Sequence, residues 1–106
     1  MKHRFLPAAR ADLIRQSRYY LVDQDAPGVS ARFRKAVRLT VEQLKRTPKI
    51  GSLVRGVIPG LRSWPVQGFE KFSLFYVEEQ GELRVVHLLH GSRNIGQIFR
   101  RESRWQ

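Results

Sequence analysis

The sequence predicts one α+β domain, because its apolar residues change their repeat along the chain. In the first half they recur every three or four residues, which is typical of helices with one buried face. From Leu53 onward they approach alternation and are rich in aromatic and β-branched types, which indicates strands. The 106 residues fit a single domain over residues 1–106, and the 42% hydrophobic fraction supplies enough apolar material for its core.

Two helices joined by a short turn are predicted to follow a short strand at residues 3–6. Pro7 suits the first turn of a helix, and Asp12 lies early in that helix, where a negative charge favours the helix dipole. Turn residues at 23–28 separate it from a second helix that is ended by Pro48. The two helices therefore form an antiparallel αα-hairpin. Their buried stripes comprise Ala9, Leu13, Ser17 and Tyr20, with Ile14 and Leu21 alongside, and Val29, Phe33, Ala36, Val37, Thr40, Val41 and Leu44.

A three-stranded antiparallel sheet and a short C-terminal helix complete the predicted fold. Residues 61–66 are extended, although Pro65 cannot donate to a strand ladder and implies an edge or a bulge. Residues 69–77 and 83–90 form the next two strands, joined by a polar loop of hairpin length. Both strands are apolar on both faces, so one face packs on the helices and the other needs cover. The final helical turn is marked by Ile95, Ile98 and Phe99.

The charge of the chain is strongly positive and unevenly distributed. Twenty Lys and Arg stand against nine Asp and Glu, a net charge of +11, and residues 1–50 hold twelve basic and four acidic side chains. A domain this basic attracts polyanions such as nucleic acid, acidic lipid or an acidic protein segment. One face of the second helix is the candidate surface, with a merely solvated face as the alternative. It carries Arg32, Arg34, Lys35, Arg38, Lys45 and Arg46.

The composition argues against cofactor, metal and membrane chemistry. The chain has no cysteine, which excludes disulfides and thiolate metal sites and makes a reducing cytoplasm its natural location. No apolar run approaches the roughly 20 residues of a membrane helix, and no glycine-rich phosphate loop is present. His87 and His90 lie three apart on a predicted strand, so they point to opposite faces and do not suggest a metal site. We expect no cofactor, no metal, no membrane association and no small-molecule substrate.

A metal-free ribonuclease is the enzymatic alternative. It needs cations that hold the scissile phosphate and a group that moves the proton. The residues of the right chemical types are Arg62, Tyr76, His90 and Arg93. The sequence alone does not show whether these four side chains meet at one site. The segment at 90–94 presents Arg93 after a glycine turn, where it can bind phosphate or carboxylate in a fork, or tie the C-terminal segment to the sheet.

Five groups of residues carry a resemblance over nearly the full chain. They are Phe5, Pro7, Ala9, Asp12 and Leu13; Leu44, Pro48 and Gly51; Pro59, Gly60, Leu61 and Arg62; Phe72 to Tyr76; and Leu83 to Leu89 with His90, Gly91, Ser92 and Arg93. In order and spacing they resemble the toxins of the RelE/ParE superfamily, from bacterial toxin–antitoxin modules. The final His-Gly-Ser-Arg is most similar to the ParE branch. The resemblance implies a RelE/ParE-like fold: a short strand, a helical hairpin, an antiparallel sheet and a short last helix.

The resemblance also implies one of two targets. RelE-like members are ribosome-dependent messenger RNA nucleases, whereas ParE-like members poison DNA gyrase. In an ungapped alignment, the cationic and tyrosine positions of the nuclease branch fall on Trp64, Val66, Ser73, Arg93 and Phe99. Only Arg93 is retained. We therefore expect a gyrase inhibitor rather than a catalyst, with ribosome-dependent cleavage of messenger RNA as the alternative.

A partner and two surfaces follow from the same resemblance. The partner is a ParD-like antitoxin whose acidic, partly disordered tail folds on the basic hairpin. Its expected contacts are Arg32, Arg34, Lys35, Arg38 and Lys45. The expected target-binding residues are Arg62, His90, Arg93 and Trp105, of which the first three would be catalytic in a ribonuclease. A third interpretation is a basic nucleic-acid-binding module, suggested by the net charge and by the arginines at 100, 101 and 104 beside Trp105.

Overall fold

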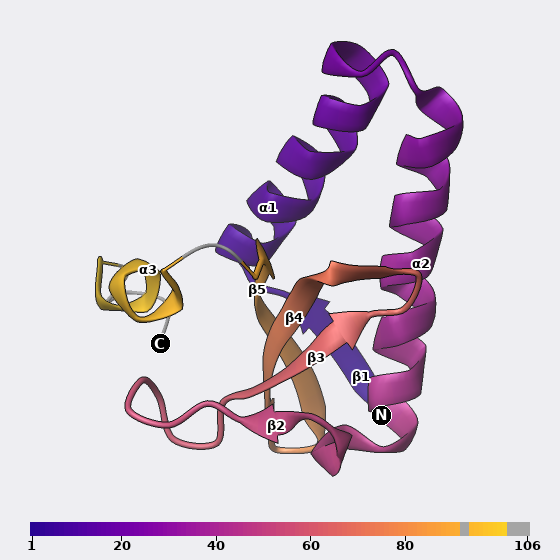
Figure 1. Cartoon of the computed structure of the whole chain (residues 1–106). Coiled ribbons are helices and arrows are strands. Elements are labelled where there is room, and N and C mark those ends of the chain that lie inside the picture. The colour runs from indigo at the N-terminus through magenta and orange to yellow at the C-terminus, as the bar shows by residue number, and fades with distance from the viewer. Residues whose placement is uncertain (92–93, 102–106) are drawn as a thin grey trace.

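A five-stranded mixed sheet organises the fold (Figure 1). The computed structural model describes residues 1–91 and 94–101, with Arg101 described by its backbone alone. The strand order is β1-β5-β4-β3-β2, in which β1 runs parallel to β5 and all other neighbours are antiparallel. The strands are β1 (Lys2–Phe5), β2 (Ser52–Leu53), β3 (Arg62–Val66), β4 (Phe69–Glu79) and β5 (Glu82–His90).

The predicted α+β class and element order are confirmed, but the sheet is larger than the three antiparallel strands expected. The N-terminal strand joins it in register with residues 82–85, and the N–H of Leu6 extends the pairing by donating to the Val85 carbonyl at 2.9 Å. At the opposite edge, Ser52 pairs with Ser63 to start the two-residue β2. A strand this short shows no alternation in sequence, and the parallel partners of β1 are about eighty positions away along the chain.

The helices form the predicted antiparallel hairpin on one face of the sheet. They are α1 (Pro7–Arg18) and α2 (Pro27–Arg46), and each begins with a proline, whose missing N–H costs nothing at that position. A π-helical turn, Tyr19–Asp23, continues α1, and a 3-10 turn, Pro48–Ile50, follows α2. The short helix α3 (Ile95–Arg101) comes after β5. Figure 1 shows the tip of the hairpin projecting beyond the sheet.

The first hydrophobic core lies between the hairpin and the sheet. Phe33 is fully buried at its centre, and its ring centroid lies 5.5, 5.1 and 5.3 Å from those of Tyr20, Phe69 and Phe72. Tilted and edge-on ring contacts of this kind add to the gain from burial alone. The predicted buried face of α2 is therefore confirmed at Phe33, Val37, Thr40, Val41 and Leu44.

Two residues assigned to the buried stripe of the first helix are instead exposed. The side chains of Ile14 and Leu21 are 52% and 48% accessible, whereas Ala9 and Ser17 are buried as predicted. A helix turns about 100° per residue, so Ile14 lies about 140° away from Ala9 and faces outward. Leu21 falls in the π-helical turn, whose wider geometry shifts the phase of the stripe.

The second core covers the opposite face of the sheet, as the apolar pattern of the two long strands requires. It is formed by the loop before β3, by α3 and by the sheet, and its buried residues are Ile58, Leu61, Phe75, Val77, Val86, Leu89 and Phe99. A β-bulge in β5 directs neighbouring side chains to both faces of the sheet. Tyr76 pairs with Val85 but Phe75 pairs with His87, so Val86 is an extra residue on β5. Val85 consequently packs in the first core and Val86 in the second.

Candidate functional site

The solvent face of α2 concentrates positive charge without internal neutralisation. Five of its cations, Arg32, Arg34, Lys35, Arg38 and Arg46, are exposed, and none of them forms an ion pair within the described part of the chain. Lys45 differs, because its Nζ lies 3.1 Å from the Glu42 carboxylate and is partly covered. This hydrogen bond lowers the pKa of Glu42. The available positive charge of α2 therefore extends from Arg32 to Arg46, with Lys45 as the paired exception.

Arg62 stabilises the bend of the chain that follows α2. Its Nη1 donates to the carbonyl oxygens of Gly51 at 2.7 Å and of Lys49 at 3.3 Å. Beside it, the Tyr76 hydroxyl donates to the Pro48 carbonyl at 2.6 Å and accepts the Gly51 N–H at 3.0 Å. Burial raises the pKa of Tyr76, so its hydroxyl stays protonated and acts as a donor. A Cβ on Gly51 would lie 2.4 Å from that hydroxyl, which explains the glycine.

Arg62 and His90 are not brought together. Arg62 pairs with Tyr76 across β3 and β4, whereas His90 pairs with Phe72 across β4 and β5. The two positions are four residues apart along β4, about 13 Å at the rise of a strand, and they lie on opposite sides of β4. The His90 ring packs edge-on against Phe72 at 5.1 Å. These two residues therefore cannot hold one phosphate between them in this arrangement.

The remaining predicted target-binding residues, Arg93 and Trp105, lie outside the described residues. Among residues 1–91 and 94–101, no three His, Asp or Glu side chains come together in a way that could hold a metal ion. No helix in this same part of the chain has both the length and the apolarity needed to cross a membrane.

A buried pair that the sequence analysis missed ties α1 to β5. The Asp12 Oδ2 lies 2.6 Å from His87 Nδ1 and accepts the backbone N–H of Leu88 at 2.9 Å. The other carboxylate oxygen accepts from Arg15 at 3.2 Å. Because β1 ends before this point, the carboxylate supplies the acceptor that a neighbouring strand would otherwise give to Leu88.

The predicted helix-dipole role of Asp12 is therefore wrong. No acidic residue lies in the first turn of α1, and the Asp12 side chain is directed at the sheet. The pair also connects to the second core, because the His87 ring packs edge-on against Phe99 of α3 at 5.1 Å. Its partners are 75 and 76 positions away, so no local pattern in the sequence marks it.

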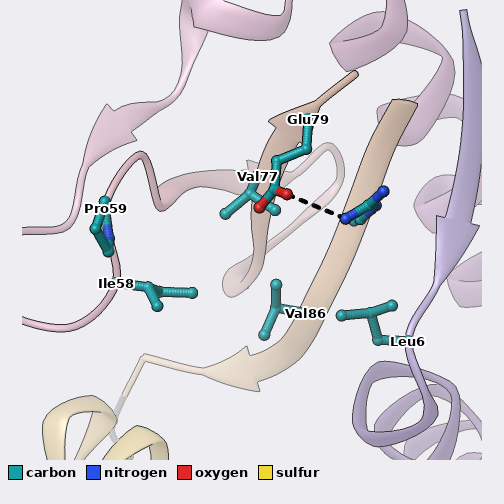
Figure 2. A pocket seen from close by; sticks show the side chains of 7 residues that line it. Leu6, Ile58, Pro59, Val77, Glu79 and Val86 are labelled. Atoms are coloured by element: carbon teal, nitrogen blue, oxygen red, sulfur yellow. Dashed lines mark hydrogen bonds and ion pairs between the residues drawn. The ribbon is translucent and has the colours of Figure 1, made fainter. Parts of the chain in front are cut away.

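A pocket of about 330 Å³ opens on the second face of the sheet (Figure 2). Its lining residues are Leu6, Ile58, Pro59, Val77, Glu79, Arg84 and Val86. The Glu79 carboxylate lies 3.2 Å from Arg84 Nη1, and a dashed line marks this ion pair in Figure 2. Arg84 also donates to Glu82 at 2.6 Å, which lowers the pKa of Glu82. Both charged groups in the lining are thus paired within the chain, and the remaining lining is apolar.

Comparison with known proteins decides the family. Residues 4–95 match the family described as "ParE toxin of type II toxin-antitoxin system, parDE", which is most of the chain. This chain belongs to the ParE toxin family. It is therefore a toxin of the type II toxin–antitoxin class.

A solved structure supports the fold of the ParE-family chain. It is described as "Chromosomal ParDE TA system from P. aeruginosa", with a TM-score of 0.60 and 24% sequence identity. The similarity covers 85% of this chain and 95% of that one, so the two share a fold. A search of curated proteins gives no significant match. The ParE match includes the hairpin, the last two residues of β1 and all of β2 to β5, but ends before Trp105.

Proposed function

We propose that this ParE-family toxin arrests bacterial growth by inhibiting DNA gyrase, and that it acts as a binding protein rather than as an enzyme. The family match supports the toxin class. The separation of Arg62 from His90 supports a non-catalytic mode, since a ribonuclease needs a cation and a proton-moving group around one phosphate. The hydrogen bonds from Arg62 to two backbone carbonyls give that side chain a structural role instead.

The partner that we propose for neutralisation is a ParD-like antitoxin with an acidic tail. The observation that carries this partner is the row of exposed cations on α2, which have no ion pair within the described residues. Carboxylates of an acidic tail would form charge-assisted hydrogen bonds with these arginines and would relieve their mutual repulsion. Association should consequently slow as the salt concentration rises.

A supercoiling assay tests the proposed target. Purified chain added to gyrase and relaxed plasmid should block supercoiling or trap cleaved DNA in proportion to its concentration. Supercoiling that proceeds normally at saturating chain would reject gyrase as the target. Primer extension on messages from induced cells then tests the ribosomal alternative, which requires discrete cuts in translated messages.

Arg93→Ala is expected to weaken growth arrest while leaving the melting temperature unchanged. The arginine fork would bind a carboxylate or phosphate of the target, and alanine removes it. Growth curves after induction measure the effect. Arg55→Ala, which removes an exposed cation from the loop before β3, serves as the control and should arrest growth like the original chain. Full arrest by Arg93→Ala would exclude a role for this arginine.

A further inference from the structure

The exposed cations on the outer face of α2 form two rows. They are Arg32, Arg34, Lys35, Arg38 and Arg46. A helix turns about 100° per residue, so Arg34 and Arg38 fall about 200° and 240° around α2 from Arg32. Lys35 and Arg46 fall at about 300° and 320°, on the side of Arg32. One row is therefore Arg34 with Arg38, and the other is formed by the remaining three.

This face is open and carries little opposing charge. From Arg32 to Arg46 it extends about 21 Å, at about 1.5 Å per residue. Figure 1 shows α2 along one side of the molecule, with α1 and the sheet both on its inner side. The single carboxylate of α2, that of Glu42, lies 3.1 Å from Lys45 Nζ. Six basic side chains minus one acidic side chain leave the helix with a net charge of +5.

The chemistry of this face favours phosphate over a lipid surface. Among the large apolar side chains of α2, which is described throughout, Leu39 alone is exposed, at 51%. A helix that lies on a membrane needs a whole apolar stripe, which one leucine does not provide. Arginine forks, in contrast, bind phosphate oxygens through charge-assisted hydrogen bonds and need no apolar contact. The phosphate backbone of a nucleic acid therefore fits these side chains.

Two rows of cations correspond to the two phosphate strands of a DNA duplex. The major groove of B-form DNA is about 12 Å wide and admits an α-helix, so each strand can face one row. Duplex RNA has a major groove too narrow for such a helix. Single strands are bound largely by stacking on exposed aromatic rings, and the one aromatic residue of α2, Phe33, is fully buried.

We propose that the outer face of α2 binds the phosphate backbone of duplex DNA along the major groove. The contact begins at Arg32, because the exposed Asp23 and Asp25 in the turn before α2 would repel phosphate. This activity goes beyond gyrase inhibition, since it needs only the chain and DNA. It would hold the toxin on the DNA on which its proposed target acts. DNA and the acidic tail of the proposed antitoxin would compete for the same cations.

Fluorescence anisotropy of the full chain with a labelled DNA duplex tests the inference. The slope of log affinity against log salt concentration should approach about −4.5, at about −0.9 for each of five phosphate contacts. Arg34→Gln combined with Arg38→Gln should weaken binding about sixtyfold at about 0.1 M salt and make the slope shallower by about 2. Arg34→Lys combined with Arg38→Lys keeps both charges and should weaken binding less than about fivefold.

The matched control removes two cations from the other side of the sheet. Arg55→Gln combined with Arg100→Gln takes the same charge from the loop before β3 and from α3, which cover the face opposite to the helical hairpin. This variant should weaken binding less than about threefold, because neither cation contacts the DNA. The four substituted side chains are exposed, so both glutamine variants should keep the melting temperature of the original chain.

Three results would overturn the inference. An affinity for the duplex that does not change with salt would exclude phosphate contacts. Equal losses in the α2 variant and the control would show that the net charge of the chain, rather than α2, attracts DNA. Equal affinity for a duplex RNA of the same length would contradict the fit of α2 to the major groove.

The supercoiling assay separates this inference from the proposed target. A chain that binds duplex DNA but leaves supercoiling unchanged would reject gyrase as the target and would leave the DNA-binding face of α2 standing. A chain that blocks supercoiling without binding duplex DNA on its own would support the target and would remove the DNA-binding face.

Discussion

Phe33→Ala is expected to lower the free energy of unfolding by about 3–5 kcal/mol, the range for truncating a fully buried phenylalanine. Phe33 has no accessible surface and joins α2 to the sheet through ring contacts with Tyr20, Phe69 and Phe72. Alanine removes all three contacts and leaves a cavity that rigid neighbours on two layers cannot close. Urea denaturation followed by circular dichroism measures the change.

The control for this substitution is Leu39→Ala, on the same helix but about half exposed. It should change the free energy of unfolding by less than about 0.5 kcal/mol. A denaturation midpoint of Phe33→Ala equal to that of the original chain would mean that α2 packs through another face.

Asp12→Ala should have an effect of similar size, about 3–5 kcal/mol, because it takes the acceptor away from two buried polar groups, at about 1–3 kcal/mol for each. The substitution removes the acceptor 2.6 Å from His87 Nδ1 and the acceptor of the Leu88 N–H. Both groups are buried, so water cannot replace the carboxylate without opening the contact between α1 and β5. Urea denaturation at constant pH measures the loss.

Arg15→Ala isolates the exposed part of the same cluster. Arg15 contacts Asp12 from the surface at 3.2 Å, and a surface ion pair contributes less than about 1 kcal/mol. The two variants should therefore differ clearly in stability. Equal and small effects would show that the buried anchor is not what holds α1 on the sheet.

The sequence predicts the helical hairpin well, because its signal is local. Phe33, Val37, Val41 and Leu44 recur at helical spacing, and they are buried as expected. The pairing of β1 with β5 and the bulge at Val86 are not local features. They depend on which distant strand meets which, and no spacing within one segment records that.

The same contrast between local and non-local signals applies to the candidate site. The cations of α2 are predicted as exposed because they lie outside its apolar stripe, and five of the six are, with Lys45 partly covered. The exposure of Ile14 and Leu21 escapes prediction because both residues recur at helical spacing beside the true buried stripe of α1. A helix with a second apolar stripe gives the same periodic signal as a broad buried face. The structural role of Arg62 is not predicted for another reason. Its partners are the backbone carbonyls at 49 and 51, and every residue type has such a carbonyl.

Growth after induction, with and without the product of the adjacent reading frame, tests most directly whether this chain is a toxin with an acidic neutralising partner. Expression of the chain alone should stop the increase in cell density, and co-expression of the neighbour should restore it. Undisturbed growth in cells that accumulate folded chain would contradict the toxin class. Arrest that an acidic neighbour fails to relieve would contradict the partner.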